Sequence, residues 1–130
     1  MKGVVIAKDD HGKEEELESL DGIQVSYASH PIPDARSIVA AKDLVAIISR
    51  ATKRTLIINC ISGGGSALFC SPRDGLTLED MELTNNQLLA SGMPITDINV
   101  IRKRLEVGKG GGLADLSYHI AYCRCLYIYG

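Results

Sequence analysis

The stretch that most constrains the fold of this chain lies near its middle, where a six-residue apolar run leads directly into a glycine-rich loop. The run is Leu56–Ile61, and most of its residues are branched and aliphatic. An uninterrupted run of this kind predicts a strand that is buried on both faces, as in a parallel sheet. We therefore expect a central parallel strand here, with residues 23–27 or 4–7 forming its neighbour.

Three consecutive glycines, Gly63, Gly64 and Gly65, follow this strand and are flanked by Ser62 and Ser66. Glycine lets the backbone approach a ligand closely, and ligands of open α/β sheets bind at the carboxyl ends of strands. Backbone N–H groups in such a loop attract anions, more so if a helix begins near Ser66. The loop is therefore either a phosphate or oxyanion cradle or a tight strand–helix turn. It matches neither the Walker A nor the G-x-G-x-x-G motif, and it lacks the second glycine of a nucleophile elbow.

The composition is typical of a single soluble globular domain. The chain has 130 residues, of which 45% are hydrophobic and 23% charged, so it is long enough for one core and too short for two. A net charge of -2 argues against nucleic-acid binding by bulk charge. No apolar stretch approaches the roughly 20 residues of a membrane span. We expect a cytoplasmic protein with no nucleic-acid and no membrane partner.

The four cysteines do not form the pattern of a disulfide framework. Cys60 lies within the expected strand and is interpreted as a small core residue. Cys123 and Cys125, with His119 nearby, could contribute to a metal site, but a second pair of ligands is missing. We therefore predict no metal site from these residues.

Hydrophobic periodicity and capping residues predict the remaining elements. Strands are expected over residues 3–8 and 22–28 and helices over residues 34–52, 78–90 and 96–106, with a helical tendency again from residue 113. Asp34 or Ser37 can cap the first helix, and Thr77 with Asp80 forms a capping-box pattern before the second. The order strand, helix, strand over residues 22–61 predicts a right-handed crossover between neighbouring parallel strands.

The helix expected over residues 96–106 has an apolar face and a basic face. Asn99, Arg102 and Lys103 project together on the side opposite the apolar positions. A second glycine loop follows, in which Lys109 precedes three glycines. These groups either bind an anion or form an ordinary solvated basic surface.

The last segment of the chain differs in composition from the rest. Four of the five tyrosines and two of the four cysteines fall within residues 118–129. We therefore divide the chain into a domain over residues 1–115 and a divergent tail, rich in tyrosine and cysteine, over residues 116–130.

Six short segments gain significance when they are taken together. They are residues 29–34 (SHPIPD), 61–68 (ISGGGSAL), 75–80 (GLTLED), 88–92 (LLASG), 98–103 (INVIRK) and 109–111 (KGG). In this order the segments resemble the glycerate 2-kinase family, whose N-terminal part is known as the MOFRL-associated domain. The resemblance covers about residues 3–114. Each segment alone is a weak signal, and the resemblance is specific because several segments occur in register.

The resemblance implies an α/β fold in which a Rossmann-like parallel sheet with flanking helices forms an incomplete N-terminal domain of a two-domain kinase. It implies ATP-dependent phosphorylation of D-glycerate to 2-phosphoglycerate with Mg2+, in a cleft that a missing C-terminal domain completes. No catalytic residue is assigned, because the lysine segment that the family carries upstream would lie before Met1. The candidates for substrate or phosphate binding are Ser62, Gly63, Gly64, Gly65, Ser66, Asn99, Arg102, Lys103 and Lys109, followed by His30 and Asp34.

The chain also departs from the family pattern. Arg104, Leu105 and Glu106 stand where the family has histidine, leucine and serine, so Glu106 places a carboxylate beside the expected anion site. Gly112 stands where the family has an arginine. We expect an interior piece of a glycerate kinase that is inactive alone. The alternatives are a non-catalytic α/β fragment and an unrelated anion-binding module.

Overall fold

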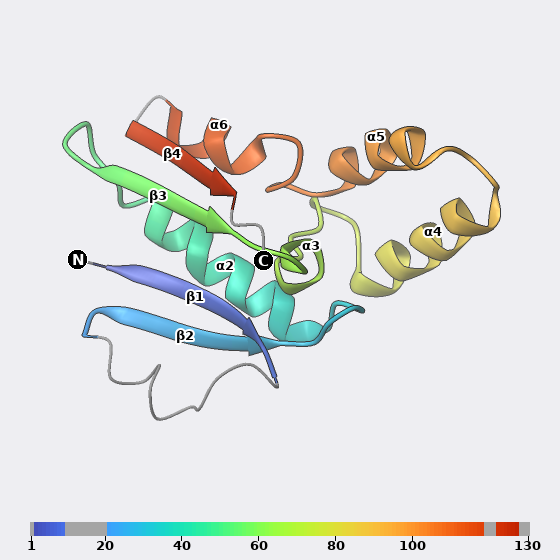
Figure 1. Cartoon of the computed structure of the whole chain (residues 1–130), viewed down its shortest axis with the longest axis horizontal. Coiled ribbons are helices and arrows are strands. Elements are labelled where there is room, and N and C mark those ends of the chain that lie inside the picture. The colour runs from blue at the N-terminus through green and yellow to red at the C-terminus, as the bar shows by residue number, and fades with distance from the viewer. Residues whose placement is uncertain (1, 10–20, 119–121, 128–130) are drawn as a thin grey trace.

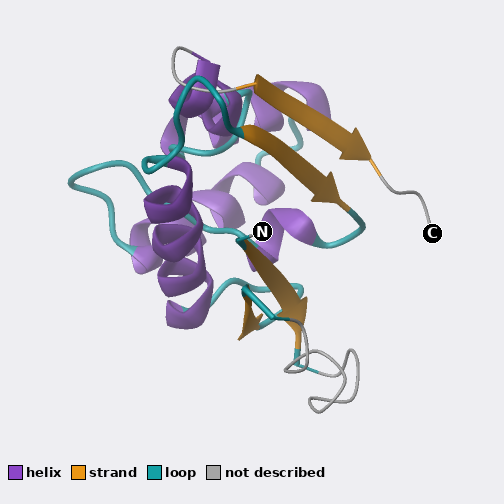
Figure 2. Ribbon diagram, turned by 90° about the vertical axis from the view of Figure 1, so that its left-hand side faces the viewer, coloured by secondary structure: helices purple, strands orange, loops and turns teal. Residues whose placement is uncertain are grey.

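The computed structural model describes residues 2–9, 21–118 and 122–127 (Figure 1). Parallel strands with flanking helices confirm the predicted α/β class. Figure 2 shows the helices gathered mainly on one side of the strands. In the described part, no helix is long and apolar enough to cross a bilayer. In chain order the elements are β1 (Gly3–Lys8), β2 (Ile23–Ala28), α2 (Ala35–Ile48), β3 (Leu56–Ile61), α3 (Gly65–Leu68), α4 (Leu78–Ala90), α5 (Ile95–Leu105), α6 (Gly112–Tyr118) and β4 (Tyr122–Tyr127).

The strands pair in two parallel sets that differ from the expected pairing. β1 pairs with β2, with Val5 opposite Val25, and β3 pairs with β4, with Ile58 opposite Arg124. The prediction that β3 neighbours residues 23–27 or 4–7 is therefore wrong, and so is the prediction that the strands joined by α2 are neighbours. Hydrophobic runs specify strands but not which parallel strand lies beside which, because parallel neighbours are joined by long crossovers.

The prediction that β3 is buried on both faces is also wrong. Its side chains alternate in exposure, with Leu56 60% and Ile58 57% exposed, and Cys60 is exposed as well, so it is not a core residue. The reason is the placement of the helices: α2 packs on β1 and β2, and α6 packs on β4. One face of β3 therefore stays open within the described part of the chain.

The first long helix begins as predicted. Asp34 caps α2 by accepting hydrogen bonds from the backbone N–H groups of Arg36 at 2.9 Å and Ser37 at 3.3 Å, and Ser37 Oγ accepts one from Asp34 N. The helix ends at Ile48, earlier than expected, with Ser49 as its C-cap, whose backbone N–H donates to Val45 O at 2.9 Å. The cap role of Asp34 accounts for its position without a ligand.

Helices α4 and α5 form one wall of the candidate site. The predicted capping box is present at α4, where Asp80 N donates to Thr77 Oγ1 and Thr77 N donates to Asp80 Oδ2. α5 is anchored by Ile98, which is 3% exposed. After α5 the chain pairs antiparallel with the segment that follows α3, through hydrogen bonds from Arg73 N to Leu105 O and from Val107 N to Ser71 O. This pairing places the residues after α5 beside the end of α3.

Candidate functional site

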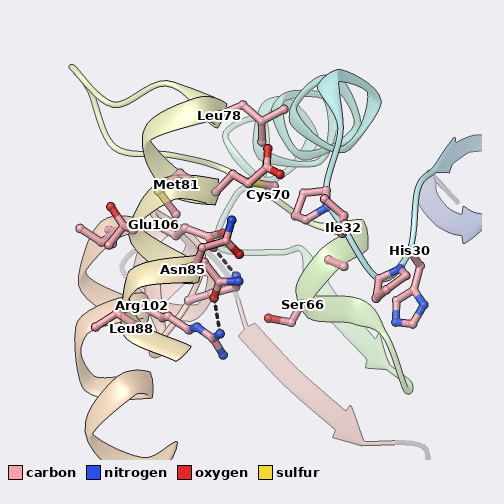
Figure 3. A pocket seen from close by; sticks show the side chains of 18 of the residues that line it. His30, Ile32, Ser66, Cys70, Leu78, Met81, Asn85, Leu88, Arg102 and Glu106 are labelled. Carbon is pink, nitrogen blue, oxygen red and sulfur yellow. Dashed lines mark hydrogen bonds and ion pairs between the residues drawn. The ribbon is translucent and has the colours of Figure 1, made fainter. Parts of the chain in front are cut away.

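A pocket of about 320 Å³ opens between the segment that precedes α2, the glycine loop and the pair α4 and α5 (Figure 3). It brings together groups that are far apart in the sequence. Five of the predicted site residues line it: His30, Gly64, Ser66, Arg102 and Lys109.

The other predicted site residues lie outside this lining. Asn99 and Lys103 are exposed on α5, whereas Arg102 donates to Asn85 on α4, so of the three polar residues expected on one face of that helix only Arg102 lines the pocket. Asp34 caps α2. The remaining members of the glycine loop, Ser62, Gly63 and Gly65, adjoin the pocket without lining it.

The glycine loop reaches the pocket through a position that only glycine occupies without strain. Gly64 has φ +83°, a left-handed conformation, and its Cα faces the ring of His30. A Cβ built on Gly64 would lie 2.9 Å from His30 Cδ2, which is closer than real Cβ contacts. The close approach of loop and ring therefore depends on the missing side chain.

Arg102 is a basic group of the pocket with a hydrogen-bond donor that has no partner among the described residues. Its Nη2 donates to Asn85 Oδ1 on α4, whereas its Nε is buried and has no hydrogen-bond partner among the described residues. A buried donor without a partner is unfavourable unless a ligand or water satisfies it. One hydrogen bond to α4 thus holds the guanidinium, and its Nε proton has no partner among the described residues.

Sequence reasoning did not identify Asn85. The residue lies 17 positions from Arg102 in the chain, and only the packing of α4 on α5 brings the two side chains together. One signal could have drawn attention to it. Asn85 lies in line with Met81 and Leu88 at helical spacing, so it is a polar residue within the stripe that lines the pocket.

Glu106 and Lys109 form an ion pair in the same pocket. Lys109 Nζ donates to Glu106 Oε1, and Ser71 N donates to Glu106 Oε2 at 3.3 Å. The side chain of Glu106 is 3% exposed and that of Lys109 is 24% exposed. The carboxylate of Glu106, which we expected beside the anion site, therefore lies beside Lys109.

Cys70 lies against this ion pair and is 1% exposed. Burial and, to a smaller extent, the negative charge of Glu106 raise the pKa of its thiol, Lys109 opposes them, and the net pKa is about 11. The thiol is therefore neutral at physiological pH, where a neutral thiol is a poor nucleophile.

We expect Cys70 to make the stability of the domain depend on pH in the alkaline range. The folded state holds the thiol proton to about pH 11 and the unfolded chain only to about pH 9. This stabilisation is therefore present below about pH 9 and is lost as the pH rises through about 11, by about 2–3 kcal/mol. Urea unfolding of wild type and Cys70→Ala across this range measures it. A difference between the two proteins that does not change with pH would contradict the prediction.

Taken together, these observations define an α/β domain in which a glycine loop and an arginine face the same pocket. Residues 1–128 match the family model described as a domain of unknown function, DUF4147. The chain therefore belongs to the DUF4147 family, the N-terminal domain of the glycerate kinases.

Individual relatives agree with this assignment. A glycerate 2-kinase of Pyrococcus horikoshii is 46% identical over 114 residues, which make up 88% of this chain and 25% of the relative. A protein of Agrobacterium vitis that is named as a hydroxypyruvate reductase is 39% identical, over 91% of this chain and 29% of the relative. The crystal structure of a glycerate kinase from Thermotoga maritima superposes with a TM-score of 0.89 at 31% identity, over 98% of this chain and 30% of that one. The chain thus spans less than a third of these relatives.

Proposed function

We propose that this chain contributes the substrate wall of a cytoplasmic glycerate 2-kinase, which transfers a phosphoryl group from ATP to the 2-hydroxyl of D-glycerate. The observation that carries the proposal is the pocket in which Arg102, whose buried Nε has no partner among the described residues, lies with Ser66 and Gly64 of the glycine loop. Two of the three relatives reported above are named as glycerate kinases, which supports the same reaction.

The chemistry of these groups suits an anionic ligand. Phosphoryl transfer depends mainly on positioning and electrostatic stabilisation. The guanidinium of Arg102 can hold a carboxylate through two parallel hydrogen bonds, and the hydroxyl of Ser66 can donate or accept. A role in the site remains a prediction for the residues that lie outside the pocket lining, which are Ser62, Gly63, Gly65, Asn99, Lys103 and Asp34.

The two implied cofactors fit the described residues unequally. ATP would supply the phosphoryl group, and the backbone N–H groups of the glycine loop are of the kind that hold phosphate oxygens. Mg2+ prefers oxygen ligands, but the described part of the chain contains no group of three or more acidic, histidine or cysteine residues placed to hold a metal. His119 and the side chains of Cys123 and Cys125 lie outside the described residues. We therefore derive no step through a metal ion.

We also propose that the 130 residues bind D-glycerate without phosphorylating it. The chain covers about a quarter of a relative that is named as a kinase, and a cleft with one wall does not exclude water or orient two substrates. A coupled assay with D-glycerate and Mg-ATP should show no turnover above the control without protein. Sustained turnover would contradict this part of the proposal.

Binding is tested by NMR titration with D-glycerate. We expect saturable shifts at the backbone amides of Gly64 and Ser66, with a millimolar or weaker affinity, because a half-site forgoes most desolvation and orientation. Arg102→Ala should weaken binding about tenfold or more, as expected for loss of a charge-assisted hydrogen bond. Arg104→Ala, which removes an exposed charge two residues away, is the matched control. Equal losses in both variants, or shifts that do not include the glycine loop, would refute the proposed site.

A further inference from the structure

The pocket contains a second cation, Lys109, but its charge is already paired. The Lys109 ammonium donates to the Glu106 carboxylate, and both side chains line the pocket. Figure 3 shows Glu106 and Arg102 in this pocket. Glu106 is almost fully buried, whereas Lys109 is only partly so. Arg102 and Lys109 are therefore not equivalent: Arg102 has a donor without a partner among the described residues, and Lys109 has a buried counter-ion.

The Glu106 carboxylate is fixed from its other side as well. Ser71 N donates to Glu106 Oε2 at 3.3 Å, and the backbone on either side of Glu106 is held by hydrogen bonds of 2.9 Å from Arg73 N to Leu105 O and 2.8 Å from Val107 N to Ser71 O. The backbone of Glu106 is therefore fixed, and its carboxylate could follow Lys109 only by giving up the hydrogen bond from Ser71 N. Separation would leave a buried carboxylate without a charged partner, which is strongly unfavourable.

We propose that Glu106 is a permanent counter-ion that neutralises Lys109, so that Arg102 alone pairs with the negative charge of a ligand. The pocket then selects a monocarboxylate over a phosphate dianion. Arg102 matches one carboxylate. The second charge of a dianion would face Glu106 and also Glu82 of α4, which lines the same pocket, and besides Arg102 the described lysines and arginines of the lining offer only Lys109, which is already paired. This inference rests on the proposed function, in which an anion enters this pocket, and makes Glu106 a specificity-determining residue.

The first test uses the wild-type chain and side-chain NMR. D-glycerate and inorganic phosphate are titrated separately at about pH 8, where inorganic phosphate is mostly dianionic. D-glycerate should shift the Arg102 Nε–H resonance to saturation and leave the Lys109 Nζ resonance in place, and phosphate should bind several-fold more weakly. A Lys109 resonance that moves with the same affinity as that of Arg102, or phosphate that binds as tightly as D-glycerate, would overturn the inference.

The second test is a double-mutant cycle with phosphate as the probe. Glu106→Gln removes the charge but keeps an acceptor for Ser71 N, so phosphate affinity should rise about tenfold. Lys109→Gln alone should not raise it, because the Glu106 carboxylate then has no counter-ion, and in the Glu106→Gln background Lys109→Gln should abolish the gain. A gain from Glu106→Gln of the same size without Lys109 would mean that the carboxylate acts by long-range repulsion, and the inference would be wrong.

The two tests separate this inference from the proposed function. If D-glycerate binding depends on Arg102 but the effects of Glu106→Gln and Lys109→Gln on phosphate affinity are additive, the role of Glu106 is refuted. The proposed function is then left intact. Absence of any binding that depends on Arg102 would refute both. Thermal unfolding of each variant checks that it is folded, and the wild-type titration decides the matter if Glu106→Gln does not fold.

Discussion

Replacing Ile98 by alanine is expected to destabilise the domain by about 2–5 kcal/mol, the usual cost of truncating a large aliphatic side chain in a core. Ile98 is 3% exposed and is the one residue of α5 that is buried. Its side chain holds the helix that carries Arg102, so the loss should reach the site as well. Chemical unfolding measures the change in stability, and D-glycerate titration measures the change in the site.

The matched control is Ile95→Ala on the same helix. Ile95 is 57% exposed, so the same chemical change should alter stability by less than about 1 kcal/mol. Similar losses in the two variants would show that α5 is not anchored through Ile98. A strongly destabilised Ile98→Ala that still bound D-glycerate with unchanged affinity would show that the position of Arg102 does not depend on this anchor.

Replacing Gly64 by alanine is expected to damage both stability and the site. The left-handed backbone at φ +83° costs an L-residue about 1–2 kcal/mol. The new Cβ would lie 2.9 Å from the ring of His30, and relieving such overpacking costs about 1 kcal/mol or more. Because His30 lines the pocket, its displacement should also weaken D-glycerate binding. Thermal unfolding and NMR titration of the variant measure the two effects.

Gly63→Ala is the control for this variant, because it makes the same substitution one residue earlier. A Cβ on Gly63 would have nothing within 4 Å, and its φ is not in the left-handed region. We therefore expect it to be neutral or slightly stabilising, since alanine reduces the entropy of the unfolded chain. Equal effects at both positions would indicate a general intolerance of the loop to side chains and not a specific contact with His30.

The candidate site could be predicted only in part. The glycine loop, Arg102, Lys109 and the neighbouring carboxylate of Glu106 were identifiable because their residue types and local spacing carry the chemistry. Asn85 could not be found in this way, because its contact with Arg102 depends on the packing of α4 against α5. The expectation that Lys103 acts beside Arg102 had the same weakness. Helical spacing puts both on one side of α5 but does not say which of them turns into a pocket.

The sequence by itself determined the local elements of this protein. The caps at Asp34 and Thr77, and α4 with its bounds, follow from hydrogen bonds and periodicities that involve residues within a few positions of each other. The tertiary structure decided which strands pair and which of their faces are covered. β3 pairs with β4 from the end of the chain, and one of its faces is open. Such choices depend on contacts between distant segments, whose free energy no local pattern encodes. The pocket is of the second kind, because its walls come from segments between His30 and Lys109 that only the packed fold brings together.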